Sequence, residues 1–163
     1  MLTQDVLNEL FTYDPDTGIF ERKIPVNQGT GNNKGKPTTY PKITIGGKPH
    51  AIHRLIWLMT YGHIPTGYMI DHVNGVRTDN TLANLRLATK EQNQQNFGMN
   101  CSNTSGFKGV RQETSCGWRA KIAGKTIGTY LTAIDAARAY DKAALEKFGE
   151  FARTNLGMGL YAA

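Results

Sequence analysis

The residues with the clearest chemical potential lie in one segment, YMIDHVNGVRTDNTLANLRLATKEQNQQN, at positions 68–96. Asp71 and His72 directly follow a short apolar run, and asparagines recur at positions 74, 80, 84, 93 and 96. A carboxylate with amide oxygens is a hard, incomplete ligand set of the kind that Mg²⁺ completes with water and substrate phosphate. A neutral histidine beside it can take a proton from water near pH 7. The same asparagines also suit turns, so both interpretations stay open at this point.

The pattern around this segment predicts the elements that would position these side chains. Residues 67–73 resemble a strand that stops at the turn-forming pair Asn74-Gly75, and leucines at 82, 85 and 87 anchor a returning strand. Adjacent residues of a strand point to opposite sides, so Asp71 and His72 can do different work.

A helix is expected after the returning strand. Thr89 and Gln92 form a capping box, which predicts a helix from Lys90 to about Gly98. Asn93 then lies in the first turn of this helix, and the whole segment has the order strand, turn, strand, helix.

The preceding residues predict a small α+β arrangement. The expected elements are a helix at 1–12, a turn at 13–18, a strand at 19–23, a loop at 25–37, a hairpin of 42–45 and 48–53 across Gly46-Gly47, and a helix that ends at Gly62.

Four motifs within about residues 50–97, namely HRLIW, IDHVNG, RTDNTLANLRL and EQNQQN, resemble the HNH nuclease domain with its ββα-metal fold. The closer resemblance is to phage-type HNH homing endonucleases, in which YDPDTGIF and a hairpin often precede the domain. The resemblance implies that His72 is the general base and that Asn84 orients its ring. It further implies that Asp71 and Asn93 bind the metal ion. The expected reaction is hydrolysis of a DNA phosphodiester to a 5′-phosphate and a 3′-hydroxyl.

The third motif position, where the family name has histidine, is occupied here by Asn93. An oxygen donor in place of nitrogen favours Mg²⁺, or Mn²⁺, over zinc. Asn96 shares nearly the same helix face and is the alternative ligand.

Other polar residues near the motif have simpler interpretations. Asn74, Asp79 and Asn80 suit turn positions rather than a ligand role. His53 and Arg54 open a helix beside the site, where they could contact phosphate, pack or cap.

The C-terminal third has a different pattern, and two thirds of the net charge lies in its residues 108–130. FKGVRQE, GWRAKIA and KTIGTYL predict three short strands, and a capping box at Thr132 opens a helix that closes at Gly149. Residues 108–130 hold five lysines and arginines against one glutamate. A basic sheet of this kind is typical of either a solvated surface or a nucleic-acid surface.

The text SGFKGVR, WRAKI and IGTYLTAIDAARAYDKAALEKFGEFARTN resembles the AP2/ERF DNA-binding domain over most of residues 105–155. The resemblance implies a small three-stranded antiparallel sheet, packed on one helix, that faces DNA. The residues expected to contact DNA are Arg111, Arg119, Lys121 and Lys125, with Trp118 packing on sugars or in the core.

Bulk composition limits the class of protein. The chain has 163 residues, a net charge of +6 and 39% hydrophobic residues, which fits one ordinary domain or two very small ones. Its longest apolar run is LIWLM, too short to span a membrane. The start of the chain lacks a basic signal-peptide region. Cys101 and Cys116 form no CxxC pair, so neither a disulfide framework nor structural zinc is expected.

These patterns together predict an α+β chain with an HNH domain at 1–99 (ββα-metal core about 67–98), a linker at 100–106 and an AP2-like domain at 107–157. We expect a metal-dependent, site-preferring DNA-nicking enzyme of the homing type. It would act on double-stranded DNA as a monomer in the cytoplasm, that of a host if a phage encodes it, without a small-molecule cofactor. The alternatives are a non-catalytic DNA-binding regulator with a decayed nuclease domain and an RNA-directed nuclease.

Overall fold

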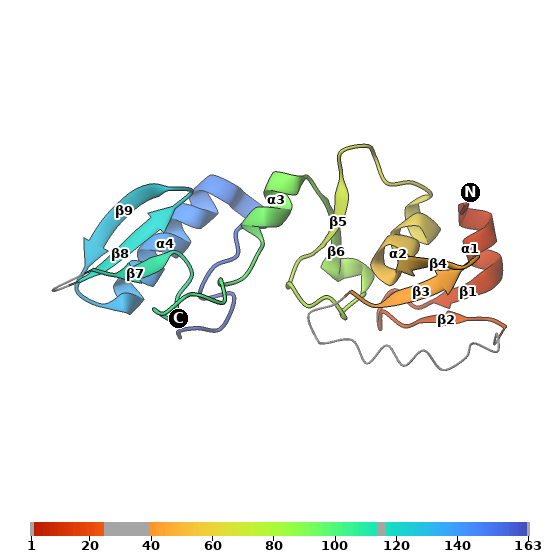
Figure 1. Ribbon diagram of the computed structural model, residues 1–163, viewed down its shortest axis with the longest axis horizontal. Helices are drawn as coiled ribbons and strands as arrows, with labels where there is room; N and C mark the ends of the chain where they lie inside the picture. Colours follow the sequence, from red (N-terminus) through yellow and green to blue (C-terminus); the bar gives the residue numbers. More distant parts are fainter. Residues whose placement is uncertain (1, 25–39, 114–116, 163) are drawn as a thin grey trace. The chain divides into compact units, whose positions relative to one another are not determined.

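The computed structural model describes residues 2–24, 40–113 and 117–162, so the loop predicted at 25–37 and Cys116 lie outside the described residues. The chain divides into two compact units, Met1–Lys90 and Glu91–Ala163. Each unit combines short helices with small antiparallel sheets (Figure 1), so the predicted α+β class is confirmed. Among the described residues, no helix has the length and apolar character needed to cross a membrane.

The first unit contains two helices, one short 3₁₀ turn and three antiparallel strand pairs within its described part: β1 with β2, β3 with β4, and β5 with β6. These elements are α1 (Gln4–Leu10), β1 (Phe11–Tyr13), β2 (Phe20–Arg22), β3 (Lys42–Ile45), β4 (Lys48–Ala51), α2 (Ile52–Tyr61), β5 (Met69–His72), η1 (Leu82–Asn84) and β6 (Leu85–Ala88).

The start of the chain differs from the predicted helix at 1–12. Thr3 caps α1 by accepting a hydrogen bond from the Val6 amide, but the helix stops at Leu10. Phe11 turns extended, with φ −132°, and begins β1. Its ring stacks on Phe20 with centroids 4.7 Å apart, so a tertiary contact overrides the helical periodicity.

The predicted hairpin across Gly46-Gly47 is confirmed, and both glycines have positive φ, 56° and 77°. Its second strand is two residues shorter than predicted, because Ile52 already begins α2. Gly62 ends α2 in the left-handed conformation, as expected.

Helix α2 holds the first unit together because it contributes to two hydrophobic clusters. Leu55 packs with Leu7 of α1 and Phe11 of β1, while Ile56 and Trp57 pack with the strand pair β5–β6 through Ile70 and Leu85. The strand that carries Asp71 and His72 is therefore fixed against a buried helix.

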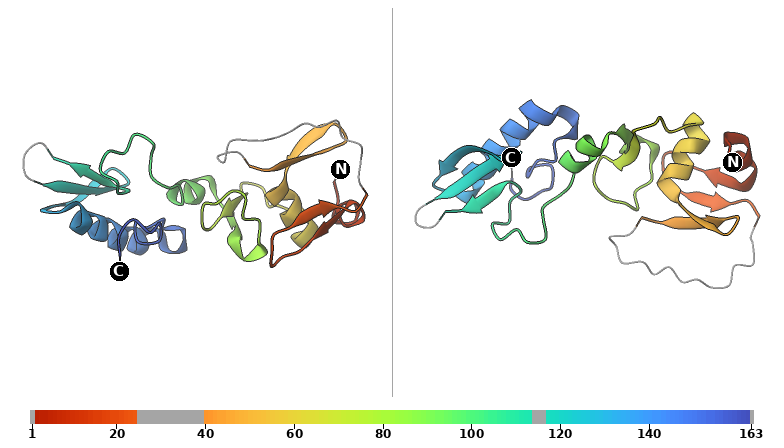
Figure 2. Two further views of the ribbon diagram at one scale, coloured as in Figure 1. Left: turned by 90° about the horizontal axis from the view of Figure 1, so that it is seen from below. Right: turned by 45° about the horizontal axis from the view of Figure 1, so that its top comes forward.

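The second unit consists of α3, a three-stranded antiparallel sheet in the order β7–β8–β9, and α4. Its elements are α3 (Lys90–Gln95, the first residue of which ends the first unit), β7 (Val110–Gln112), β8 (Trp118–Ile122), β9 (Lys125–Tyr130), α4 (Ala133–Phe148) and η2 (Gly149–Phe151). Figure 2 shows α4 along one face of this sheet, which confirms the predicted sheet-on-helix arrangement. Helix α3 is shorter than the predicted span to Gly98.

The packing of α4 on the sheet follows from the strand alternation. Ala120 and Ile122 are buried with the small residues Ala136, Ala137 and Ala144 of α4, which let the helix lie close to the strands. Thr132 caps α4 as predicted: its hydroxyl oxygen accepts from the Asp135 amide at 3.1 Å.

A buried polar hub joins α4 to the chain that follows it. Asp141 accepts hydrogen bonds from the Asn155 amide (2.7 Å), the Asn155 side chain (2.9 Å), the Leu156 amide (2.9 Å) and the Tyr161 hydroxyl (2.8 Å). Asn155 is fully buried, and its side-chain Oδ1 atom accepts from the Lys108 amide at 2.6 Å. Asn155 thus links the segment before β7 and helix α4 to the C-terminal segment.

Replacing Asn155 with alanine should lower the free energy of unfolding of the second unit by about 3 kcal/mol, since Asp141 and the Lys108 amide would lose partners in a dry interior. Urea unfolding followed by Trp118 fluorescence in a Trp57→Phe background measures this. The control is Asn100→Ala, an exposed asparagine whose side chain bonds only residues 101 and 102. Equal losses in the two variants would contradict a stabilising hub.

Candidate active site

Strand β5 carries both residues of the predicted reaction centre in its last two positions. Asp71 is 6% exposed and His72 is 3% exposed. The antiparallel register pairs Asp71 with Arg86 and His72 with Leu85 of β6. Because cross-strand partners share a side of the pair, the carboxylate and the imidazole point to different sides.

Asp71 forms a nearly buried ion pair with Arg86. The Arg86 Nη2 and Nε atoms lie 3.0 Å and 3.1 Å from Asp71 Oδ2. Both contacts reach the same oxygen, so the guanidinium fixes the orientation of the carboxylate. The sequence interpretation missed Arg86, whose place opposite Asp71 is set by the pairing of β5 with β6.

The hydrogen-bond partner of the His72 ring is Asn80, a residue that was expected to serve the turn. The Nε2 atom of His72 lies 3.2 Å from Asn80 Oδ1, and Asn80 is itself 6% exposed. Sequence analysis expected Asn84 to orient the ring by hydrogen bonding, and that role stays a prediction. The Asn84 side chain accepts from the Asn74 amide at 2.9 Å and donates to the Asp79 carbonyl at 2.8 Å.

Asn84 therefore closes the loop between β5 and η1. Within this loop, Asn74 donates to Asp79 Oδ2 at 2.6 Å, and the Thr81 hydroxyl donates to Asp79 Oδ1 at 2.8 Å. The Thr81 hydrogen bond is the main cause that lowers the pKa of Asp79. Asn74 and Asp79 are turn residues, as the sequence suggested.

An aromatic cluster surrounds the His72 ring. The His53 ring lies edge-on at 5.1 Å from His72, and Tyr40 lies 5.9 Å from His72 and 4.7 Å from His53, all between centroids. Arg77 places its guanidinium carbon 4.6 Å from the centre of the Tyr40 ring. The sequence placed His53 beside the site but missed Tyr40 and Arg77, which approach only through the fold.

Both histidines of this cluster are held towards the neutral form. Burial, with smaller contributions from the neighbouring His72 and Arg54, lowers the pKa of His53 to about 4. The His53 Nδ1 atom is buried and has no hydrogen-bond partner among the described residues. Burial also lowers the pKa of His72, against the opposing effects of the Asn80 hydrogen bond and the Asp71 carboxylate. A neutral imidazole is the form that can accept a proton.

The predicted ligand Asn93 and its alternative Asn96 belong to the second unit. Asn93 lies half-buried in α3, and Asn96 is buried directly after that helix. Their part in a metal site stays a prediction. Among the described residues, no three His, Cys, Asp or Glu side chains gather as a metal cluster. One carboxylate with amide oxygens fits Mg²⁺ in donor chemistry.

The predicted DNA-binding residues divide between the two faces of the sheet. Arg111 pairs with Arg119 across the strands, and Lys121 follows on the same outer side, where it is exposed. Lys125 instead pairs with Ile122, whose side chain faces α4. Its expected place beside Arg119 is therefore wrong, because the two-residue turn at 123–124 returns it on the other side.

Two of these residues already have partners inside the protein. Arg119 forms an ion pair with Glu113, and both side chains are about one-third exposed. Trp118 is half-buried and packs against the hydrophobic core of the sheet and α4. Of the two roles that the sequence left open for Trp118, the structure supports the core role.

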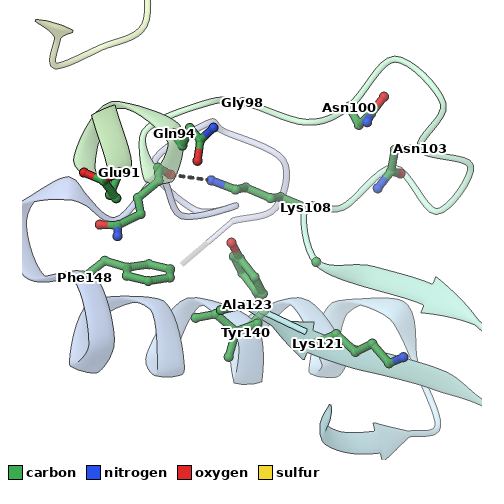
Figure 3. Close-up of a pocket in the computed structure, with 13 residues that line it drawn as sticks. Glu91, Gln94, Gly98, Asn100, Asn103, Lys108, Lys121, Ala123, Tyr140 and Phe148 are labelled. Atoms are coloured by element: carbon green, nitrogen blue, oxygen red, sulfur yellow. Dashed lines mark hydrogen bonds between the residues drawn. The ribbon is translucent and has the colours of Figure 1, made fainter. Parts of the chain in front are cut away.

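The second unit also contains a cavity of about 470 Å³ (Figure 3), lined by α3, the 98–103 segment, the sheet and α4. The Lys108 ammonium donates there to the carbonyls of Gln95 at 2.8 Å and Phe97 at 2.7 Å. Burial lowers the pKa of Lys108 to about 8, with a further effect of Arg153. Lys108 thus ties the end of α3 to the sheet, which explains a compact unit that begins at Glu91.

Comparison with known proteins supports both resemblances. Residues 50–95 match the family model described as HNH endonuclease. An uncharacterized HNH endonuclease of Acanthamoeba polyphaga mimivirus is 37% identical over 109 residues, which cover 64% of this chain and 56% of that protein. Protein 3.8 of Escherichia phage T7 is 45% identical over 58 residues, 36% of this chain and 48% of its own length.

The C-terminal region is similar to a different group of proteins. Ethylene-responsive transcription factor ERN1 of Medicago truncatula is 39% identical over 82 residues, which cover 47% of this chain and 31% of that factor. The chain spans 31% to 56% of the lengths of these three relatives. No solved structure matches the chain.

The neutral His53 should make the fold sensitive to acid. Since its pKa of about 4 in the folded state lies below the ordinary 6.5, the unfolded chain binds more protons between these values. Stability should therefore fall as the pH drops through this window, by on the order of 3 kcal/mol. Urea unfolding at several pH values measures the slope. His53→Phe keeps the ring and removes the titration, so its slope should be shallower; an unchanged slope would contradict the assignment.

Proposed function

Given the likeness of residues 50–95 to HNH endonucleases, we propose that this chain is a metal-dependent endonuclease that hydrolyses DNA phosphodiester bonds. The observation that carries the proposal is the buried pair of Asp71 and His72 at the end of β5, inside the matched segment. A carboxylate fixed by an arginine beside a neutral imidazole is a suitable starting state for base-assisted attack of water on phosphorus.

His72 acts as the general base in this proposal. Its neutral ring takes a proton from the attacking water, the new oxygen–phosphorus bond forms, and the bond to the 3′ oxygen breaks; the released 3′ oxygen takes a proton from solvent water. The products are a 5′-phosphate and a 3′-hydroxyl. Asn84 supports the ring indirectly, because its hydrogen bonds hold the loop that follows β5.

Asp71 and Asn93 are the proposed holders of Mg²⁺, with Mn²⁺ as a possible substitute. The support is the chemistry of their oxygens, which suits a hard divalent cation. When bound, such an ion neutralises charge that develops on the phosphate and on the leaving oxygen. Arg86 keeps the Asp71 carboxylate in one orientation through its contacts at 3.0 Å and 3.1 Å.

The sheet of the second unit is the proposed holder of double-stranded DNA. The support is its similarity to ethylene-responsive factors and the exposed basic side of β7 and β8, with Arg111, Arg119 and Lys121. DNA would compete with Glu113 for Arg119, which costs binding energy there. Positive side chains on a small sheet supply phosphate contacts that fix orientation.

The finer features of the proposal are a site-preferring enzyme of the homing type that nicks one strand and acts as a monomer in the cytoplasm. The competing proposal is a DNA-binding regulator whose nuclease unit no longer cuts. The presence of Asp71, His72, Asn84 and Asn93 together favours the enzyme.

His72→Ala should lower the rate of plasmid relaxation with Mg²⁺ by about 10²- to 10⁴-fold, the usual range for loss of a general base. Asp71→Asn and chelation by EDTA should also abolish relaxation, while gel-shift binding of duplex DNA persists. His63→Ala, an exposed histidine after α2, is the matched control.

Unchanged cleavage by the His72 variant would remove it from the mechanism. Binding by the wild type without cleavage across several divalent metals would favour the regulator, and a preference for RNA substrates would favour the RNA-directed alternative.

Arg111→Ala and Lys121→Ala should each weaken DNA binding at every sequence and reduce the slope of log affinity against log salt by about 1. Fluorescence anisotropy with a labelled duplex measures both quantities. Lys125→Ala should have a smaller effect, since Lys125 pairs with Ile122 on the side of α4. Lys142→Ala, on the exposed side of α4, is the control. Equal effects at Lys142 and Arg111 would exclude the outer side as the specific DNA surface.

A further inference from the structure

The hairpin of β1 and β2 contacts the segment that precedes β6. The Tyr13 hydroxyl at the end of β1 donates to the Asn80 carbonyl at 2.9 Å, and the Leu82 amide donates to the Pro15 carbonyl at 3.0 Å. Burial is the main cause that raises the pKa of Tyr13 to about 12, so its hydroxyl keeps the proton it donates. Two hydrogen bonds therefore join an N-terminal turn to residues some seventy positions later.

Gly18, at the end of the same turn, sets how closely the two segments approach. It has φ +71°, and a Cβ built on it would lie 2.7 Å from the Thr81 nitrogen and 2.8 Å from the Asn80 carbonyl carbon. Both neighbours are backbone atoms, so they cannot swing away as a side chain would. Only glycine allows the turn to pack directly on the peptide that follows Asn80.

The side chain of Asn80 points from this supported backbone to the reaction centre. Its Oδ1 atom lies 3.2 Å from His72 Nε2, and its Nδ2 atom lies 3.5 Å from the Thr78 carbonyl. The amide oxygen thus faces the ring, which makes Nε2 the protonated nitrogen of a neutral imidazole. Nδ1 is then the nitrogen with the lone pair, and it is the atom that would accept the proton of water.

We propose that Asn80 is a positioning residue that fixes the tautomer of His72, and that the β1–β2 hairpin holds Asn80 in place through Tyr13, Pro15 and Gly18. The catalytic part of this proposal rests on the proposed endonuclease function, whereas the tautomer does not. A simple turn residue would need neither 6% exposure nor a packed hairpin behind it.

The tautomer can be measured without any cleavage. The chain has four histidines, so the ring nitrogens of His72 can be assigned in ¹⁵N–¹H spectra by comparison with His72→Gln. The wild type should show a protonated Nε2 and an unprotonated Nδ1 at a pH where the ring is neutral. Asn80→Ala should give a mixture of tautomers, while Asn80→Asp, which keeps an acceptor, should retain the Nε2–H form. A wild-type ring that is protonated at Nδ1, or that is unchanged by Asn80→Ala, overturns the proposal.

The hairpin is tested with a pair of glycine variants. Gly18→Ala and Gly47→Ala both place alanine at a positive φ, 71° and 77°, but nothing lies within 4 Å of a Cβ at Gly47. Gly18→Ala should broaden the tautomer population and lower kcat by as much as about 100-fold with little change in KM. Gly47→Ala, which has the positive-φ cost without the backbone contacts, should leave the tautomer and kcat unchanged.

Tyr13→Phe gives an independent test, because it removes one hydrogen bond and keeps the ring. It should lower kcat less than Gly18→Ala, and Tyr68→Phe, at an exposed tyrosine of the same unit, is its control. Equal losses for Gly18→Ala and Gly47→Ala, or losses confined to KM, would overturn the positioning role. If no form of the protein cuts DNA, the proposed function fails and the tautomer still decides the proposal about Asn80.

Discussion

The pairing of β5 with β6 is the constraint on which the candidate site depends. It brings Arg86 to the side of Asp71 and leaves His72 on the side of Leu85, so a charged pair and a neutral ring lie on opposite sides of one strand end. A buried carboxylate without a partner would be costly, and the arginine offsets this cost while it fixes the carboxylate. Packing of Ile70 and Leu85 on Ile56 and Trp57 keeps the register from slipping, since a slip of one residue would reverse both sides.

Two asparagine side chains also make hydrogen bonds around this strand end, and they differ in how close they come to His72. Asn84 bonds only backbone atoms and shapes the loop, whereas Asn80 reaches the imidazole itself. Aromatic rings lie beside His72, with His53 as a neutral packing partner.

Local patterns predicted the elements well, because they depend on a few neighbouring residues. The turn at Gly46-Gly47, the cap at Thr132 and the alternation of Trp118 to Ile122 follow from backbone conformation and side-chain size. Predictions failed where distant residues decide the outcome. Phe11 leaves the helix for a ring contact with Phe20, and Asn80, which the sequence assigned to the turn, reaches the imidazole. Lys125 was misplaced for a local reason, the parity of a two-residue turn, which could have been counted.

The hydrogen bonds at Asp141 limit where the chain can be truncated if the sheet and α4 are produced as a separate fragment. The predicted limit at residue 157 would retain Asn155 and Leu156 but lose the Tyr161 hydroxyl, which donates to Asp141 Oδ2 at 2.8 Å. That oxygen would keep only the Leu156 amide, in an interior where Asp141 is 5% exposed. The segment up to Tyr161 is therefore part of the smallest fragment that keeps all the hydrogen bonds of Asp141.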